Sequence, residues 1–186
     1  MSQIKLNVPF VDESIITSLQ AGDKILLSGT IYTARDAAHK RMVEQIENGE
    51  NLPLELSNQV IYYVGPTPAK QGEVIGSAGP TTSSRMDNYT PTLLEQGLKG
   101  MIGKGYRGQE VINSIAKNNA VYFAAIGGSG ALLSQKIKSV EPVAYEDLGT
   151  EAIRKLIVQD FPCMVINDTA GRDWYKESQE KFRLNK

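Results

Sequence analysis

Cysteine, histidine and tryptophan each occur only once in this chain of 186 residues. A lone cysteine, Cys163, can neither form an internal disulfide nor hold a metal cluster by itself, which fits a reducing cytosol. No sign of charge dominates either, because 20 lysines and arginines face 21 aspartates and glutamates. Nucleic-acid binders usually carry a basic excess, so this balance argues against that class and favours a small anion wherever cations gather.

Long apolar runs are also missing. No apolar stretch approaches the roughly 20 residues that cross a bilayer, and the start "MSQIKLNVPF" lacks the basic and apolar regions of a signal peptide. We therefore expect a cytoplasmic chain without a membrane span. With 41% hydrophobic residues and no repeat or linker that divides it, the chain is expected to form one domain over 1–186.

The spacing of apolar residues predicts strands that alternate with helices. Strands are expected at 4–10, 23–34, 59–65, a short stretch from 100, 120–128, 139–149 and 162–168. Helices are expected at 12–22, 35–49, 92–98, 109–119, a turn within 129–137, 150–160 with Thr150 as its N-cap, and a tail from 172. This alternation predicts an α/β or layered β/α fold, which places ligand loops at strand ends.

One long loop, "SAGPTTSSRMDNYTP" from Ser77 to Pro91, is unusually rich in hydroxyl groups. Thr81 and Thr82 offer hydroxyls and backbone N–H groups, and Arg85 offers a planar fork that matches a carboxylate. Asp87 stands close enough in sequence to orient Arg85 by accepting from its other edge. The alternative is a surface loop that binds nothing, since loops rich in serine and threonine are common.

Two further cations stand where predicted strands end. Arg35 lies at a strand-to-helix junction in "GTIYTARDAAHKR", where free helix N–H groups also favour anions. His39 follows one helical turn later and has either an acid–base or a structural role. Lys104 stands between two glycines in "MIGKGYRG", and Tyr106 and Arg107 after it could line the same site.

The glycine-rich turn in "AAIGGSGALL" does not predict a nucleotide site. It contains neither G-x-G-x-x-G nor G-x-x-x-x-G-K-[ST]. Close packing, or a cradle of backbone N–H groups for an anion, explains it better.

Together, Arg35, Arg85 and Lys104 place three cations on three loops, with threonine hydroxyls beside one of them. A dicarboxylate needs about this equipment, one clamp for each end and a polar group between. No zinc motif, Ser-His-Asp order or pair of catalytic carboxylates stands out. The chain therefore resembles half of a site, with substrate clamps but no evident catalyst.

These same segments resemble a known family. "LLSGTIYTARDAAHKR", "GPTTSSRMD", "MIGKG" and "AIGGSGALL" are similar to the β subunit, or C-terminal domain, of iron–sulfur hydro-lyases. These enzymes are the class I fumarate hydratases and the L-tartrate dehydratases. The resemblance covers about Ile4 to Trp174, and the pairing of "ARDAAHKR" with "GPTTSSRMD" is its specific part.

The resemblance implies a fold, a partner and a cofactor. The fold would be a single swivelling β/β/α domain. The partner would be an α subunit whose three cysteines hold a [4Fe–4S] cluster with one open iron, so that the enzyme is a hetero-oligomer and this chain carries no metal. The reaction would add or remove water in a C4 dicarboxylate, fumarate/malate or tartrate/oxaloacetate.

The family's site residues also transfer position by position. Its substrate-binding residues fall on Arg35, Thr81, Thr82, Arg85 and Lys104, and its proposed proton-transferring threonine falls on Thr81. A non-catalytic module that binds a small anion and regulates or scaffolds a partner remains the alternative.

Overall fold

The computed structural model describes residues 3–183, which form one mixed α/β domain as the sequence predicts. The strands are β1 (Ile4–Val8), β2 (Lys24–Thr33), β3 (Val60–Tyr62), β4 (Gly100–Gly103), β5 (Val121–Ala124), β6 (Ile137–Ala144) and β7 (Ile153–Asn167). The α-helices are α1 (Glu13–Ser18), α2 (Asp36–Glu47), α3 (Thr90–Glu95), α4 (Gln109–Lys117), α5 (Gly130–Ser134) and α6 (Trp174–Phe182). Two short 3-10 helices are η1 (Ser83–Met86) and η2 (Glu146–Glu151).

The sheet closes on itself. Its order is β1-β2-β3-β4-β5-β7-β6, with a further pairing between β2 and β7. That pairing joins β2, β3, β4, β5 and β7 into a ring. The pairs from β1 to β5 are parallel, whereas β7 runs antiparallel to β2, β5 and β6. The carboxyl ends of β2 to β5 therefore share one edge of the domain.

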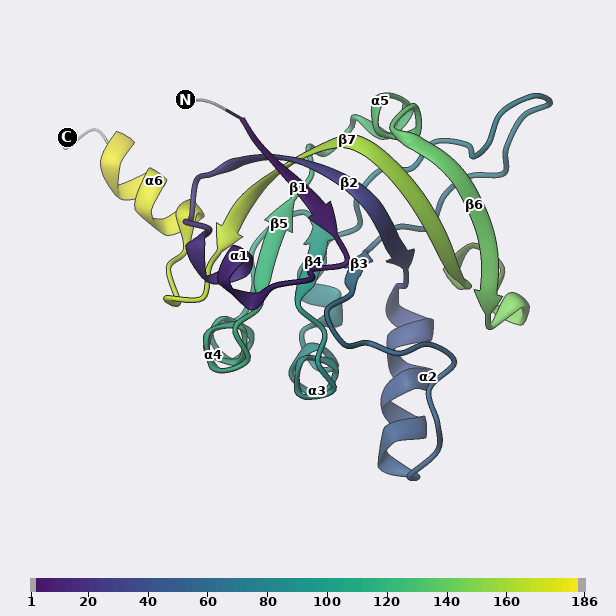
Figure 1. Ribbon diagram of the computed structural model, residues 1–186, viewed down its shortest axis with the longest axis horizontal. Coiled ribbons are helices and arrows are strands. Elements are labelled where there is room, and N and C mark those ends of the chain that lie inside the picture. Colours follow the sequence, from purple (N-terminus) through teal and green to yellow (C-terminus); the bar gives the residue numbers. More distant parts are fainter. Residues whose placement is uncertain (1–2, 184–186) are drawn as a thin grey trace.

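Two hydrophobic cores follow from the two-residue period of the strands. Val60 and Tyr62 of β3 face the inside of the ring, where they pack with Phe123. Ile61 and Tyr63 face outward into a second core, which α2, α3 and α4 cover. Figure 1 shows these three helices side by side on one side of the domain, with β2, β6 and β7 across the other. The layers are therefore β/β/α, and this fold prediction is confirmed.

The helix expected at 150–160 is wrong. Residues 153–167 form the single strand β7, which also includes the strand expected at 162–168. The apolar residues Ile153, Leu156 and Ile157 are spaced as on a helix. They nevertheless lie on one strand, with Ile153 and Leu156 buried and Ile157 partly buried. A β-bulge follows these residues, because Asp160 adopts a left-handed φ of 49° and the register against β2 shifts there. Leu156 is buried before the bulge and Phe161 after it.

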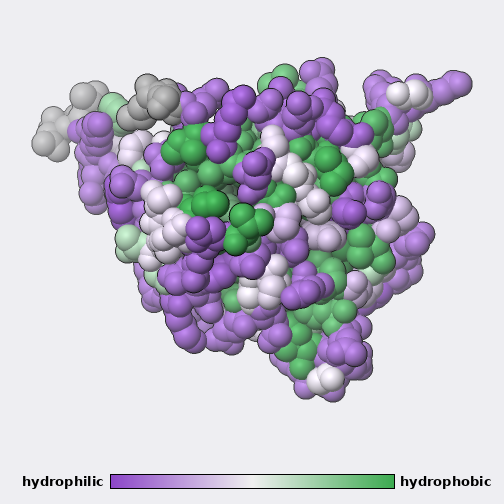
Figure 2. All heavy atoms as spheres, in the orientation of Figure 1, coloured by the Kyte–Doolittle hydropathy of each residue, from purple (hydrophilic) through white to green (hydrophobic). Residues whose placement is uncertain are grey.

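The surface is mixed in character. Figure 2 shows hydrophilic residues over most of one face, with apolar residues gathered over β1 and α1. Among the described residues 3–183, no helix is long and apolar enough to cross a membrane.

Candidate functional site

The loops that follow β2, β3, β4 and β5 meet at one edge of the domain. This arrangement follows from the parallel strands, whose carboxyl ends are the usual place for ligands in α/β proteins. Arg35 follows β2, Thr81 and Thr82 lie in the connection after β3, and Lys104 directly follows β4. The substrate-binding residues predicted from the sequence therefore lie on neighbouring loops.

The segment around Thr81 is held like an extra strand beside the ends of β3 and β4. The Thr81 N–H donates to the Tyr63 carbonyl at 2.7 Å, and the Lys104 N–H donates to the Thr81 carbonyl at 3.1 Å. The Ser83 N–H then donates to the Lys104 carbonyl at 2.8 Å. Thr82 is exposed and Thr81 is partly exposed, so backbone bonds fix this loop while both side chains remain accessible.

The glycine-rich turn after β5 packs against the same region. The Ala78 N–H donates to the Gly130 carbonyl at 3.1 Å, and a Cβ on Gly130 would overlap Ser77. A Cβ on Gly127 would touch the Lys104 side chain at 3.6 Å. Close packing, one of the two interpretations that the sequence left open, therefore explains Gly130. Gly128 has open space around it but a φ of 81°, which glycine adopts readily.

A single carboxylate, Asp36, lies between the two arginines of the predicted site. Nε of Arg85 donates to Oδ1 of Asp36 at 2.8 Å, and Nε of Arg35 lies 3.6 Å from Oδ2. Asp36 is the first residue of α2, so it joins the loop after β2 to the "GPTTSSRMD" loop. The sequence predicted the two arginines but not this link between them.

Arg35 has a second carboxylate partner, Glu151. Nη2 of Arg35 lies 3.0 Å from Oε1 of Glu151, and Oε2 accepts from the Ala37 N–H at 2.8 Å. The N-terminus of α2 and the Arg35 guanidinium therefore share one carboxylate. The region around these two groups is favourable for anions. Gly65 leaves room for the guanidinium, because a Cβ there would overlap Nη1 of Arg35.

Asp87 does not form the ion pair with Arg85 that the sequence suggested. Oδ1 of Asp87 lies 2.8 Å from Nε of Arg107, although the two are not aligned as a hydrogen bond, and Oδ2 accepts from the Gly108 N–H at 2.7 Å. The Arg107 side chain is fully buried and donates to the hydroxyls of Thr90 and Tyr63. This buried pair fixes the end of the "GPTTSSRMD" loop from beneath.

His39 faces the interior rather than the solvent. Its side chain is fully buried, and its Nδ1 lies 2.9 Å from the Arg35 carbonyl, so Nδ1 carries the proton and donates. Burial lowers the pKa of His39 from 6.5 to about 4, so the ring is neutral at pH 7. The ring packs edge-on against Tyr63 at 5.1 Å. In this structure His39 supports the backbone that carries Arg35.

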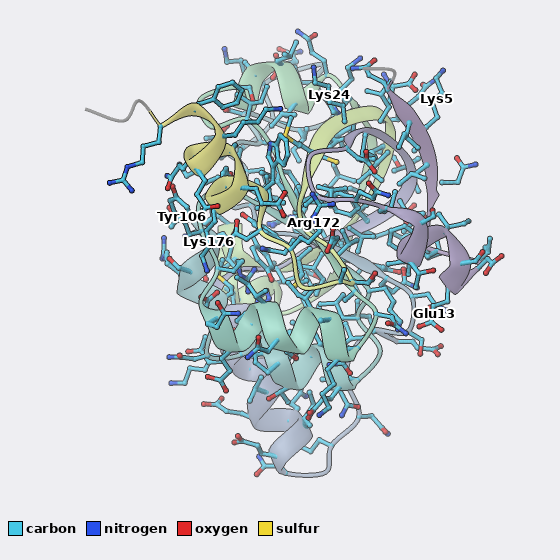
Figure 3. All side chains as sticks on the ribbon, turned by 90° about the vertical axis from the view of Figure 1, so that its left-hand side faces the viewer. Lys5, Glu13, Lys24, Tyr106, Arg172 and Lys176 are labelled. Atoms are coloured by element: carbon cyan, nitrogen blue, oxygen red, sulfur yellow. The ribbon has the colours of Figure 1, made fainter. Side chains whose placement is uncertain are left out.

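Tyr106 turns away from the site edge. Its ring centroid lies 4.9 Å from that of Tyr175 on α6, and its hydroxyl accepts from Gln179. Figure 3 shows Tyr106 beside α6, near Lys176. Of the two residues after Lys104, Tyr106 therefore packs on the terminal helix and Arg107 lies in the core.

The side chains of this chain do not suit an iron–sulfur cluster. Such clusters need several thiolates, whereas Cys163 is the only cysteine, and burial raises the pKa of its thiol. Within residues 3–183, no group of three histidine, cysteine or acidic side chains is placed to hold a metal ion. A cluster at this edge would need cysteines from elsewhere.

Sequence reasoning missed Asp36 and Glu151, and it did not foresee that Arg107 is buried. Asp36 had a signal, because it lies beside Arg35 at the start of a helix, where acidic residues are favoured. Glu151 lies in the segment 150–160, for which the sequence predicts a helix. The pairing of β7 with β2, which brings Glu151 to Arg35, therefore does not follow from the sequence. Arg107 was considered only as a lining residue.

Comparison with known proteins gives consistent results. The family model described as "Fumarase C-terminus" matches residues 1–178. The chain is 42% identical over 158 residues to the aerobic class I fumarate hydratase of Escherichia coli (strain K12), which covers 84% of this chain and 29% of that protein. It is 36% identical over 165 residues to fumarate hydratase 2 of Leishmania major, covering 88% of this chain and 29% of the relative.

A third relative is similar in length. The proposed L(+)-tartrate dehydratase subunit beta of Methanocaldococcus jannaschii is 36% identical over 172 residues, covering 89% of this chain and 88% of that protein. The chain thus spans less than a third of the two fumarate hydratases but most of this separate subunit.

Proposed function

The chain belongs to the fumarase C-terminus family, and from this premise we propose that it is the β subunit of a hydro-lyase acting on a C4 dicarboxylate. The reaction is the reversible hydration of fumarate to malate, or the dehydration of L-tartrate to oxaloacetate. The named relatives support both substrates, and the name of the Methanocaldococcus jannaschii relative, a dehydratase subunit beta, supports the β-subunit role.

One observation carries the proposal: the loops that hold Arg35, Arg85 and Lys104 adjoin one another at a single edge of the sheet. Arg35 and Arg85 meet at Asp36, while the backbone of Lys104 pairs with that of Thr82 beside them. Because these cations lie on separate, rigidly held loops, they can bind the two ends of a dianion without a rearrangement of the loops. Arg85 is half exposed, with 51% of its side chain accessible, so its outer face can meet a ligand.

The chemistry of the reaction explains why cations and hydroxyls are needed. Removing a proton from the carbon next to a carboxylate builds negative charge on the carboxylate oxygens. Arg35, Arg85 and Lys104 would stabilise this charge more in the transition state than in the ground state. In this proposal Thr81 contacts the substrate and transfers the proton. Its hydroxyl is a weak base unless the neighbouring cations lower its pKa.

A partner chain completes the proposed enzyme. The α subunit would hold a [4Fe–4S] cluster through its own cysteines, and the two chains would form a hetero-oligomer in the cytoplasm. Bound there, the cluster would supply a Lewis acid. The lone, buried Cys163 supports a cluster held by the partner, because a cluster needs several thiolates and the sequence contains one cysteine.

A reconstitution assay tests the proposal. The chain is assayed alone and with its cognate cysteine-containing subunit, assembled anaerobically with iron and sulfide, on fumarate, malate and tartrate. Activity only in the mixture supports the proposal and identifies the substrate. An intact cluster without activity on any of the three would favour a non-catalytic module that binds a small anion.

A further inference from the structure

Asp36 is the only described residue whose carboxylate approaches both Arg35 and Arg85. Arg85 comes from η1, 49 residues further along the chain, and Arg35 is the N-cap of α2. Without Asp36 no hydrogen bond or ion pair would connect the Arg85 guanidinium to the rest of residues 3–183. The orientation of Arg85 therefore depends on one interaction.

The atoms involved leave the binding edge of Arg85 available. A guanidinium offers two edges to a carboxylate, one made by Nε and a terminal nitrogen and one made by the two terminal nitrogens. Asp36 accepts from Nε of Arg85 at 2.8 Å. The two terminal nitrogens make no hydrogen bond to the part of the chain that the structure describes, so a ligand carboxylate can meet them in a bidentate pair.

The contact with Arg35 is incomplete in this structure. Oδ2 of Asp36 and Nε of Arg35 are both buried, and neither has a hydrogen-bond partner among residues 3–183. They face each other at 3.6 Å, which is longer than a hydrogen bond. Two unsatisfied buried groups at this distance need only a small movement to pair. Hydrogen bonds in sites of this kind are often long before the ligand binds and tighten afterwards.

We propose that Asp36 is a positioning residue that holds Arg35 and Arg85 in one orientation for a dicarboxylate, with its negative charge as the essential feature. The inference rests on the proposed function and adds a residue to that site. Asp36 lies near the ligand's own negative charge, so by Coulomb's law alone it would weaken binding. Any favourable effect of Asp36 on binding must therefore come through the arginines. The direct effect of its charge weakens binding and the positioning effect strengthens it, so a measured change in affinity distinguishes the two.

The test is a double-mutant cycle on the assembled two-subunit enzyme. Asp36→Asn, Arg85→Ala and the double variant are compared with the unaltered enzyme, measuring KM, kcat and the inhibition constant of succinate, an unreactive dicarboxylate. Asp36→Asn should raise KM and the inhibition constant about tenfold, because the ordering of two flexible side chains is lost. In the Arg85→Ala background the same change should have a clearly smaller effect on both constants, because only the part that acts through Arg35 remains.

Two controls separate positioning from folding. Asp147→Asn removes a similar aspartate–arginine pair, Arg41–Asp147, between the same helix and η2, and should leave KM unchanged. Asp36→Glu keeps the charge and should recover part of the lost affinity. If Asp36→Asn does not fold, Asp36→Ser serves in its place, since serine is well tolerated at helix N-termini.

Each outcome has a definite meaning. Equal effects of Asp36→Asn with and without Arg85, or tighter succinate binding in both backgrounds, would overturn the positioning role. If the unaltered complex binds succinate but turns over no substrate, the proposed function fails while the cycle still tests Asp36 through binding. If it neither binds succinate nor turns over a dicarboxylate, both proposals fall.

Discussion

The backbones of Thr82 and Lys104 pair in an isolated parallel bridge, so two predicted substrate-binding residues from distant segments are fixed side by side. The bridge uses only main-chain atoms. The Lys104 side chain is exposed and contributes nothing to it. Side-chain substitutions at Lys104 therefore test chemistry without disturbing the loop.

Replacing Lys104 with methionine keeps its length and removes its charge. We expect kcat/KM of the assembled enzyme to fall by about 10²–10³, the usual loss for one group that stabilises developing negative charge. The melting temperature should not change, because the backbone bridge remains. Lys117→Met, which removes an exposed partner of Glu95, is the matched control. A loss of activity that follows a loss of melting temperature would speak against the assignment.

Replacing Arg85 with alanine removes a half-exposed clamp of the proposed site. The expected cost is about 2–4 kcal/mol of transition-state stabilisation, measured as the ratio of kcat/KM values. Arg41→Ala removes another partly exposed arginine that pairs with an aspartate, and it should retain activity. Full activity in Arg85→Ala would remove the "GPTTSSRMD" loop from the site.

Gly65→Ala tests the position of the Arg35 side chain without removing a charged group. The new Cβ would overlap Nη1 of Arg35, so the guanidinium must move away from Glu151. We expect KM for the dicarboxylate to rise several-fold, with a smaller change in kcat, because ligand binding is affected first. The same KM in both proteins would show that Arg35 does not need this position.

The fold was predictable where each segment carries a single period. Helix α2 shows its apolar stripe through Met42 and Val43, and β3 shows continuous burial, so both were recognised. Strand β7 was not predicted as one strand, because the bulge at Asp160 changes the phase of the apolar pattern along it. A bulge is specified by its partner strand, here β2, and one segment read alone does not contain that information.

The residues proposed for the site could be named from the sequence, but the contacts that these residues make could not. Arg35, Arg85 and Lys104 were found because each stands at the end of a predicted strand or in a loop rich in hydroxyls. Their carboxylate partners come from other segments. Glu151 reaches Arg35 across 116 positions of sequence, and Asp87 turns to Arg107 because the core offers it a buried cation. Such pairings depend on tertiary structure.

Arg107→Met should destabilise the domain. The substitution leaves the Asp87 carboxylate beside a core without its cation, and breaking a buried ion pair in this way costs about 3–5 kcal/mol. Chemical denaturation of the isolated chain measures the free energy of unfolding. The double variant Arg107→Met, Asp87→Asn should recover part of the loss, because no uncompensated charge remains. Equal stability of the single variant and the unaltered chain would contradict the buried pair.

His39 should make the stability of the chain depend on pH. Its pKa is about 4 in the folded chain and 6.5 when unfolded, so the unfolded state binds the additional proton between these values. The stabilisation from neutral His39 is therefore complete above pH 6.5 and is lost as the pH falls toward 4. The loss amounts to about 3 kcal/mol by pH 4.

The measurement compares the unaltered chain with His39→Asn, whose side-chain nitrogen can still donate to the Arg35 carbonyl but does not titrate. The free energy of unfolding is determined by denaturant at several pH values from 7 to 4. Carboxylates titrate alike in both proteins, so their contribution cancels in the difference. The unaltered chain should lose about 3 kcal/mol more than the variant over this range. Parallel curves would mean that His39 is accessible to protons in the folded chain, and its place as a buried support of Arg35 would have to be abandoned.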